Sequence, residues 1–362
     1  MPGTAYRTTN HLRALRIAKR IRNSSMSTSG VVREKNGQDS SEMTATKYLY
    51  TREEIPQALW EPAILGGYRK PDGTMKDCLY SLFWLHNETF NIWTHLVAMV
   101  FFVYYAINKG LQMNLMEEEY QPLLCLLVTS LIYPLGSIIA HTFNCISVKS
   151  LHIGFMFDYY GITLYAFGAA IGNKAYAFPL EWRGGLWDRY FLLGSLVTCV
   201  IAMILSCESR MRPFDVVAKL TRATGFLIPY AYGMSPCLYR AYTVDTTATI
   251  YYIYHVYSGI ATVSFYLSHF PESLFPGRFD IYFHSHQVFH VTIAMGTWLK
   301  TAGFLEDKAS GHPASNARYC ILYLIGLTIT NAFILGYYTR RTLDQEEDIK
   351  DLNENLLFKK VK

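Results

Sequence analysis

The chain carries few charges for its length. Of its 362 residues only 17% are charged, whereas 51% are hydrophobic and 15% are aromatic. This balance is too apolar for an ordinary soluble protein. The net charge of +5 is also small, and no basic stretch interleaved with aromatic residues forms a nucleic-acid-binding face. Composition therefore indicates a membrane protein that does not bind nucleic acid.

The cysteines show no recognisable spacing. The seven cysteines are odd in number and scattered, and no Cys-x-x-Cys pair occurs anywhere in the chain. The spacing therefore indicates neither a disulfide framework nor a zinc site built from thiolates.

Residues 1–47 lack an apolar run of the length that a secretory signal peptide requires, so we expect no such peptide. Their content of Ser, Thr and Arg predicts a disordered, basic cytosolic tail. Because no acidic residue precedes Glu34, the segment also mimics a mitochondrial transit peptide, which is the alternative interpretation.

What the chain has in abundance is long apolar runs, each close to the ~20 residues with which a helix crosses a hydrocarbon layer roughly 30 Å thick. We expect membrane-spanning helices at residues 91–107, 122–141, 153–171, 190–206, 223–239, 248–267, 287–305 and 319–338. The fifth run contains Pro229 and Pro236, which membrane helices tolerate when neighbouring groups satisfy the freed backbone atoms. The sequence predicts an all-α integral membrane protein.

Basic residues near the ends of these runs set the expected orientation. With a cytosolic amino terminus, twelve Lys and Arg residues flank the helices on the cytosolic side and eight on the other side. The twelve are Arg69, Lys70, Lys76, Lys149, Arg210, Arg212, Lys219, Arg222, Arg278, Arg340, Arg341 and Lys350, and the eight are Lys109, Lys174, Arg183, Arg189, Arg240, Lys300, Lys308 and Arg318. The excess favours a cytosolic amino terminus.

Polar groups at the ends of three runs fall at one depth. His141 ends the second run, Asp158 begins the third, and His286 and His290 begin the seventh. Because successive helices alternate in direction, all three sites lie in the same leaflet, which is the cytosolic one in the expected orientation. Such groups are costly within a membrane, so each requires an explanation.

The spacing of the histidines predicts a metal site. Ser137 with His141, and His286 with His290, are separated by four residues, so each pair lies on one helix face. Three imidazoles leave one tetrahedral position of a zinc ion open, as in catalytic zinc sites, and zinc lowers the pKa of a bound water to roughly 7. We expect Asp158 to act as a general base and Ser137 to donate to an oxyanion.

Structural roles are the alternative for each of these residues. A single histidine at a helix end is more often a packed or interfacial residue than a ligand, and His284 competes with His286 for the place in the cluster. Asp158 can instead pair with a basic loop residue. Ser137 can bond back to a carbonyl beside the kink expected at Pro134.

Eight short motifs occur in the order of a known family. They are Gly67-Tyr68-Arg69, Ser81-Leu82-Phe83, His86-Asn87-Glu88-Thr89, Asn91-Ile92-Trp93-Thr94-His95-Leu96, Ser137-x-x-x-His141, Asp158-Tyr159-x-Gly161, Pro271-Glu272-x-x-Phe275-Pro276-Gly277-x-Phe279-Asp280 and Ser285-His286-Gln287-x-Phe289-His290. Together they resemble the progestin and adipoQ receptor (PAQR) family over about residues 48–305. The eighth apolar run makes the chain most similar to the membrane progestin receptor branch.

The resemblance implies a seven-helix core with a cytosolic amino terminus, followed by an eighth, carboxyl-terminal transmembrane helix. It also implies a zinc ion held by His141, His286 and His290. The expected organisation is a tail at 1–47, a membrane-proximal cytosolic segment at 48–90, a core at 91–305, a loop and eighth helix at 306–340 and a charged cytosolic tail at 341–362.

The function that the resemblance implies is a signalling receptor of the plasma membrane, or of an endomembrane, that binds a steroid or other lipid. Its expected partners are membrane lipids and a G protein or other cytosolic effector.

Family members also resemble membrane hydrolases that share one Ser, one Asp and three His residues, so a zinc-dependent, ceramidase-type amide hydrolase is the first alternative. A transporter or channel is the second, although the sequence shows no inverted repeat.

Overall fold

The computed structural model of the chain describes residues 48–212, 216–243, 246–315 and 317–358. The tail expected at residues 1–47 lies outside them. Of the two compact units into which the chain divides, the first is Tyr48–Leu343. The candidate site lies wholly within the first unit.

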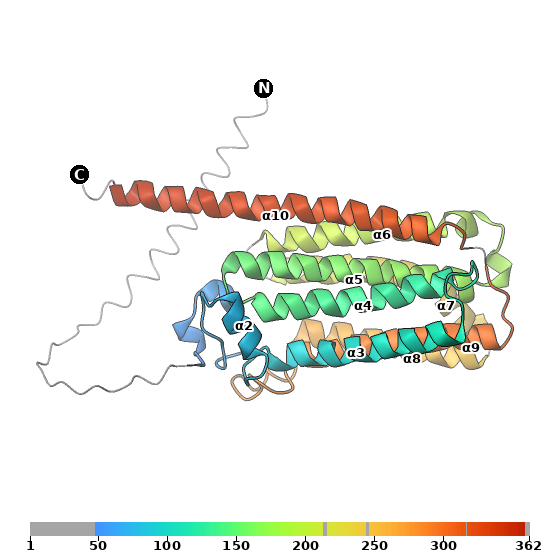
Figure 1. The fold of residues 1–362 in the computed structure, drawn as a ribbon, viewed down its shortest axis with the longest axis horizontal. Helices are drawn as coiled ribbons and strands as arrows, with labels where there is room; N and C mark the ends of the chain where they lie inside the picture. Colours follow the sequence, from blue (N-terminus) through green and yellow to red (C-terminus); the bar gives the residue numbers. More distant parts are fainter. Residues whose placement is uncertain (1–47, 213–215, 244–245, 316, 359–362) are drawn as a thin grey trace, which may run out of the picture. The chain divides into compact units, whose positions relative to one another are not determined.

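Seven of the eight predicted runs lie within long helices, and the eighth begins at Tyr319, one residue before its helix. The helices run side by side as a bundle (Figure 1). The helices are α2 (Met75–Ser81), α3 (Thr89–Gln112), α4 (Gln121–Phe143), α5 (Val148–Tyr176), α6 (Leu186–Arg210), α7 (Val216–Thr243), α8 (Thr247–Ser268), α9 (Ser285–Ala309) and α10 (Cys320–Phe358). Among the described residues the only β pairing is an isolated bridge between Tyr50 and Tyr68. The prediction of an all-α integral membrane protein is confirmed at this level.

Most helices are longer than their apolar runs because capping and propensity, which hydropathy does not measure, set their ends. Helix α5 begins at Val148 because the Ser147 hydroxyl accepts a hydrogen bond from the Ser150 amide, 3.0 Å away. Helix α10 runs on to Phe358, through the segment expected as a charged tail. The residues from 341 onward include neither Gly nor Pro, so nothing in them breaks a helix.

Four helices of the described residues are long and apolar enough to cross a membrane by length and hydropathy, namely α3, α4, α6 and Cys320–Gln345 of α10. The others carry polar side chains inside the bundle. Helix α5 buries Asp158 and Lys174, and α9 buries His290 and Lys300. These buried groups lower mean hydropathy without exposing charge to the outer surface of the bundle.

Helices α4 and α5 pack so closely that glycine is required between them. A Cβ atom at Gly161 would lie 2.9 Å from the Tyr133 Cα, and one at Gly136 would lie 3.2 Å from the Phe157 carbonyl oxygen. Small residues allow this approach of membrane helices, in which packing rather than the hydrophobic effect drives association. The contact holds the end of α4 and the beginning of α5 together, where Ser137 and Asp158 lie.

The membrane-proximal segment folds at one end of the bundle, where α2 contacts α4 (Figure 1). It contains the 3-10 helices η1 (Arg52–Glu54) and η2 (Gln57–Leu59), and Ile55, Ile64 and Tyr68 form a small apolar cluster. The Asp280 carboxylate accepts a hydrogen bond from the Leu65 amide at 3.1 Å, which joins the segment to the loop before α9. The segment therefore contacts α4 and the loop before α9.

Candidate functional site

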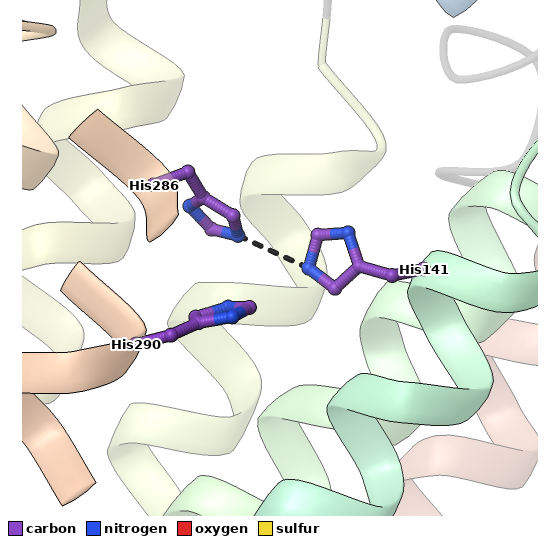
Figure 2. A group of neighbouring side chains, drawn as sticks. All are labelled: His141, His286 and His290. Carbon is purple, nitrogen blue, oxygen red and sulfur yellow. Dashed lines mark hydrogen bonds between the residues drawn. The ribbon is translucent and has the colours of Figure 1, made fainter. Parts of the chain in front are cut away.

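The three predicted histidines converge from two helices. His141 comes from α4, while His286 and His290 come from the first two turns of α9, and their rings face one another (Figure 2). One nitrogen from each lies within 4.8 Å of the others, and the Nε2 atoms of His141 and His286 are 3.1 Å apart. His141 and His290 are buried and His286 is half-buried. The structure thus brings together residues separated by 145 positions in the chain.

Glu88 fixes the orientation of His141. Its carboxylate lies 2.7 Å from Nδ1 of His141 and also accepts hydrogen bonds from the side-chain amides of Asn91, at 2.6 Å, and Asn144, at 2.7 Å. With the Nδ1 proton held by Glu88, the Nε2 lone pair of His141 points toward the other two histidines. Metal-binding histidines are commonly held by a carboxylate in this way.

The second histidine whose ring is fixed is His290. Its Nδ1 lies 3.0 Å from the Asn91 carbonyl oxygen and 3.2 Å from the Thr94 hydroxyl. The His95 ring packs against that of His290, with ring centroids 3.8 Å apart and an angle of 33° between the ring planes. The first turns of α3 therefore set the tautomer of His290 and leave its Nε2 atom directed away from them.

Glu88 and Asn91 were not among the predicted site residues, although both lie in motifs of the resemblance. The sequence does place the Glu88 carboxylate immediately before an apolar helix, and a buried charge there needs a partner. Spacing does not show that the partner is His141, 53 residues away.

Arg69 closes the end of α4. This buried guanidinium donates to the carbonyl oxygens of His141 and Thr142, both at 2.7 Å, and to the Asn144 side chain at 2.8 Å. The last carbonyls of a helix have no partner within the helix, and a cation there also interacts favourably with the helix dipole. Arg69 thereby fixes the backbone that carries His141.

His284, the competitor for a place in the cluster, lies outside it. Its Nε2 atom is 3.2 Å from the Asn87 carbonyl oxygen, and the residue precedes the first turn of α9. Glu272 binds this turn by accepting hydrogen bonds from the amide and hydroxyl of Ser285. Burial opposes the charge on Glu272, but the hydrogen bonds from His269 and Ser285 outweigh it and lower the pKa of the carboxyl group.

Ser137 and Asp158 lie beside the cluster without bonding to it. The Ser137 hydroxyl is buried and has no hydrogen-bond partner within the described chain. It therefore does not bond back to a carbonyl near Pro134. Asp158 is buried and interacts electrostatically with His141, but the described residues show no hydrogen bond between Asp158 and any of the three histidines. Ser137 is four residues before His141 on α4 and Asp158 interacts with the same histidine, and the catalytic roles of both residues stay predictions.

Comparisons with known proteins show which family the chain is similar to. The family described as haemolysin-III related matches residues 83–301, more than half of the chain. The chain is 34% identical over 268 residues to membrane progestin receptor gamma of Homo sapiens. This alignment covers 72% of this chain and 81% of that protein. It is 30% identical over 308 residues to membrane progestin receptor delta of Homo sapiens, covering 80% and 90%. It is 27% identical over 323 residues to membrane progestin receptor alpha of Homo sapiens, covering 83% and 91%.

The role of Arg69 is testable by substitution. Arg69→Met leaves the carbonyls of His141 and Thr142 buried without donors, which costs roughly 1–3 kcal/mol for each such group. We expect a clear fall in the thermal unfolding midpoint of the detergent-purified protein. Lys70→Met is the matched control, because the neighbouring Lys70 is exposed, and it should unfold at the wild-type temperature. Equal midpoints for both variants would show that Arg69 does not hold the end of α4.

Proposed function

The chain belongs to the haemolysin-III related family, and from this premise we propose that it is a plasma-membrane steroid receptor of the progestin type that signals to a cytosolic effector such as a G protein. The observation that carries the proposal is the similarity to membrane progestin receptors gamma, delta and alpha over most of their length. Their names describe progestin receptors, and the steroid ligand is extended to this chain on that ground. Endomembranes are the alternative location.

The proposed topology has eight membrane-spanning helices, from α3 to α10, with both termini in the cytosol. It is supported by the distribution of Lys and Arg residues, twelve of which flank the helices on the cytosolic side and eight on the opposite side. The histidine cluster then lies near the cytosolic leaflet. The segment of residues 48–90, which covers this end, is exposed to cytosolic partners.

An apolar cavity supports the binding of a lipid-like ligand. It has a volume of about 140 Å³, lies between α7 and α8, and is lined mainly by apolar and aromatic residues. Its lining residues include Met234, Ala241 and Tyr252. Sites for drug-sized molecules usually have roughly 300 Å³ or more, so binding of a steroid here requires the surrounding side chains to move apart.

The receptor proposal predicts saturable binding of radiolabelled progesterone to membranes of cells that express the chain, competed by the unlabelled steroid. Ala241→Phe fills the cavity and should weaken binding at least about tenfold, which corresponds to 1.4 kcal/mol. Tyr242→Phe, at a neighbouring position with 92% of the residue exposed, is the control and should bind as the wild type does. Binding no greater than in cells without the chain would count against a progestin receptor.

We also propose that His141, His286 and His290 bind one zinc ion. A tetrahedral zinc with Zn–N bonds of about 2.0–2.1 Å holds its nitrogen ligands roughly 3.3 Å apart, close to the 3.1 Å between the Nε2 atoms of His141 and His286. Glu88 and the Asn91 carbonyl hold the opposite nitrogens of His141 and His290, as in known metal sites. Neutral imidazole is the form that binds zinc, and burial favours that form.

Metal analysis of the purified protein tests the site. The wild type should contain close to one zinc per chain and His290→Ala almost none, whereas Glu88→Gln should weaken zinc binding about 10–100-fold. His284→Ala is the matched control, because His284 bonds to the Asn87 carbonyl outside the cluster and its loss should leave zinc in place. Zinc retained in His290→Ala would refute the proposed ligand set.

A zinc-dependent amide hydrolase acting on a ceramide-like lipid is the second candidate function. The specific observation in its favour is the buried, unpartnered hydroxyl of Ser137, four residues before His141, with Asp158 near the same histidine. A bound zinc ion would polarise a carbonyl group and lower the pKa of water. In this proposal Ser137 would donate to a developing oxyanion, and Asp158 would accept a proton.

Turnover of a fluorescent ceramide by the purified protein tests this second function. Ser137→Ala should lower kcat by about 10²–10³, the usual effect of losing one oxyanion donor. Ser195→Ala is the control, since Ser195 is also buried without a hydrogen-bond partner but lies on α6. If turnover survives His286→Ala, hydrolysis does not occur at this site.

A further inference from the structure

The fold places four of the seven cysteines in two pairs. The Sγ atoms of Cys78 and Cys145 are 3.6 Å apart, and those of Cys125 and Cys320 are 3.9 Å apart. All four are free thiols in the structure. Neither pair is visible in the sequence, because the partners are 67 and 195 residues apart.

The two pairs lie at opposite ends of the same helix. Cys125 is in the first turns of α4, and Cys145 follows the end of α4 at Phe143. Twenty residues at a rise of 1.5 Å span about 30 Å, which equals the thickness of a bilayer's hydrocarbon core. Figure 1 shows α2, which carries Cys78, at one end of the bundle and the beginning of α10, which carries Cys320, at the other.

Opposite membrane faces differ in redox state. The cytosol keeps thiols reduced, whereas the lumenal and extracellular face allows disulfides to form and persist. Of the two thiol pairs at the ends of α4, one therefore faces reducing conditions and the other faces conditions in which a disulfide can form. Which pair is oxidised depends on the orientation of the chain.

Cys125 and Cys320 connect the core to the last helix. Cys125 lies within the region that matches the family, residues 83–301, whereas Cys320 is the first residue of α10, beyond it. Further along, α10 bonds to the core through Asn331, whose amide donates to the Thr163 hydroxyl at 2.9 Å, and through Tyr338, whose hydroxyl donates to Glu208 at 3.2 Å. A covalent bond at Cys320 would fasten the beginning of this helix as well.

We infer that Cys125 and Cys320 form a disulfide in the cell that fastens α10 to α4, while Cys78 and Cys145 remain reduced. The inference rests on the proposed cytosolic amino terminus, which places Cys125 and Cys320 on the lumenal side. One Sγ–Sγ bond forms and two S–H bonds break. The two electrons and two protons pass to the disulfide of a lumenal thiol–disulfide oxidoreductase, which is reduced to a dithiol.

The geometry allows this bond with small movements. A disulfide has an S–S length of about 2.05 Å, so the two sulfur atoms must approach each other by roughly 2 Å. Cys320 lies where the loop after α9 meets α10, eleven residues before Asn331, so a rotation of its side chain is local to the beginning of the helix. Both cysteines are buried, at 3% and 1% exposure, which protects the bond once the bundle has formed.

Differential alkylation of the full-length chain tests the inference. Cells are lysed in N-ethylmaleimide, the protein is purified and reduced, and newly freed thiols receive a second, mass-distinguishable label. We expect Cys125 and Cys320 to carry the second label and Cys78 and Cys145 the first. In the unreduced digest, one peptide pair linked through Cys125 and Cys320 should be found by mass spectrometry.

The orientation of the chain is measured separately, by testing whether an added protease removes an epitope tag at the amino terminus in sealed microsomes. If all four cysteines carry the first label and the protease removes the tag, the disulfide is absent and the cytosolic amino terminus is retained. Second label on Cys78 and Cys145 instead would overturn both.

Thermal unfolding gives a readout that does not depend on labelling. Dithiothreitol should lower the midpoint of the wild type by roughly 5–10 °C, because reduction frees a long loop in the unfolded chain. The C125S/C320S variant should already unfold at the lower temperature and show no response to dithiothreitol. The matched C78S/C145S variant should keep the response, and its loss there would contradict the assignment.

Discussion

The hydrogen bond between Glu88 and His141 is the contact on which the arrangement of the cluster depends. A buried carboxylate without partners is costly, and this one is satisfied by His141, Asn91 and Asn144 together. The three partners come from the end of α4, the beginning of α3 and the loop after α4. Because the carboxylate can be buried only where these segments meet, its burial fixes their relative positions. Asn91 in turn holds His290 through its carbonyl, so α9 is placed by the same network.

Much of the fold and of the cluster could be predicted from local pattern. Apolar length located eight helices, and the alternation of helix direction put His141, Asp158 and His286 at one end of the bundle. The four-residue spacing of His286 and His290 placed both on one face of α9, and the structure shows them there. These inferences succeeded because each rests on the geometry of a single helix or on the fact that adjacent helices reverse direction. Zinc binding itself and the number of membrane crossings stay predictions.

The remaining features depend on contacts between distant segments, which spacing does not encode. Glu88 and Arg69 were visible only as motif residues, and nothing in the sequence said that they meet at the end of α4. The cysteines looked scattered because their pairing follows from the packing of α2 and α10 against α4. Helix ends depend on a different property of the sequence. Helix α10 continues beyond the apolar run that ends at residue 338 because backbone propensity supports a helix there, whereas hydropathy measures only partition into lipid.

Arg69 connects the membrane-proximal segment to the backbone at His141. The Arg69 side chain of that segment donates hydrogen bonds to the backbone carbonyls of His141 and Thr142, so these bonds fix the distance between the segment and the end of α4. Hydrogen bonds weaken steeply beyond their normal length, so a shift of about one ångström in residues 66–70 is enough to break the bonds from Arg69 to these carbonyls. The position of residues 66–70 is thereby coupled to the backbone that carries His141, although none of these residues is a ligand of the histidine cluster.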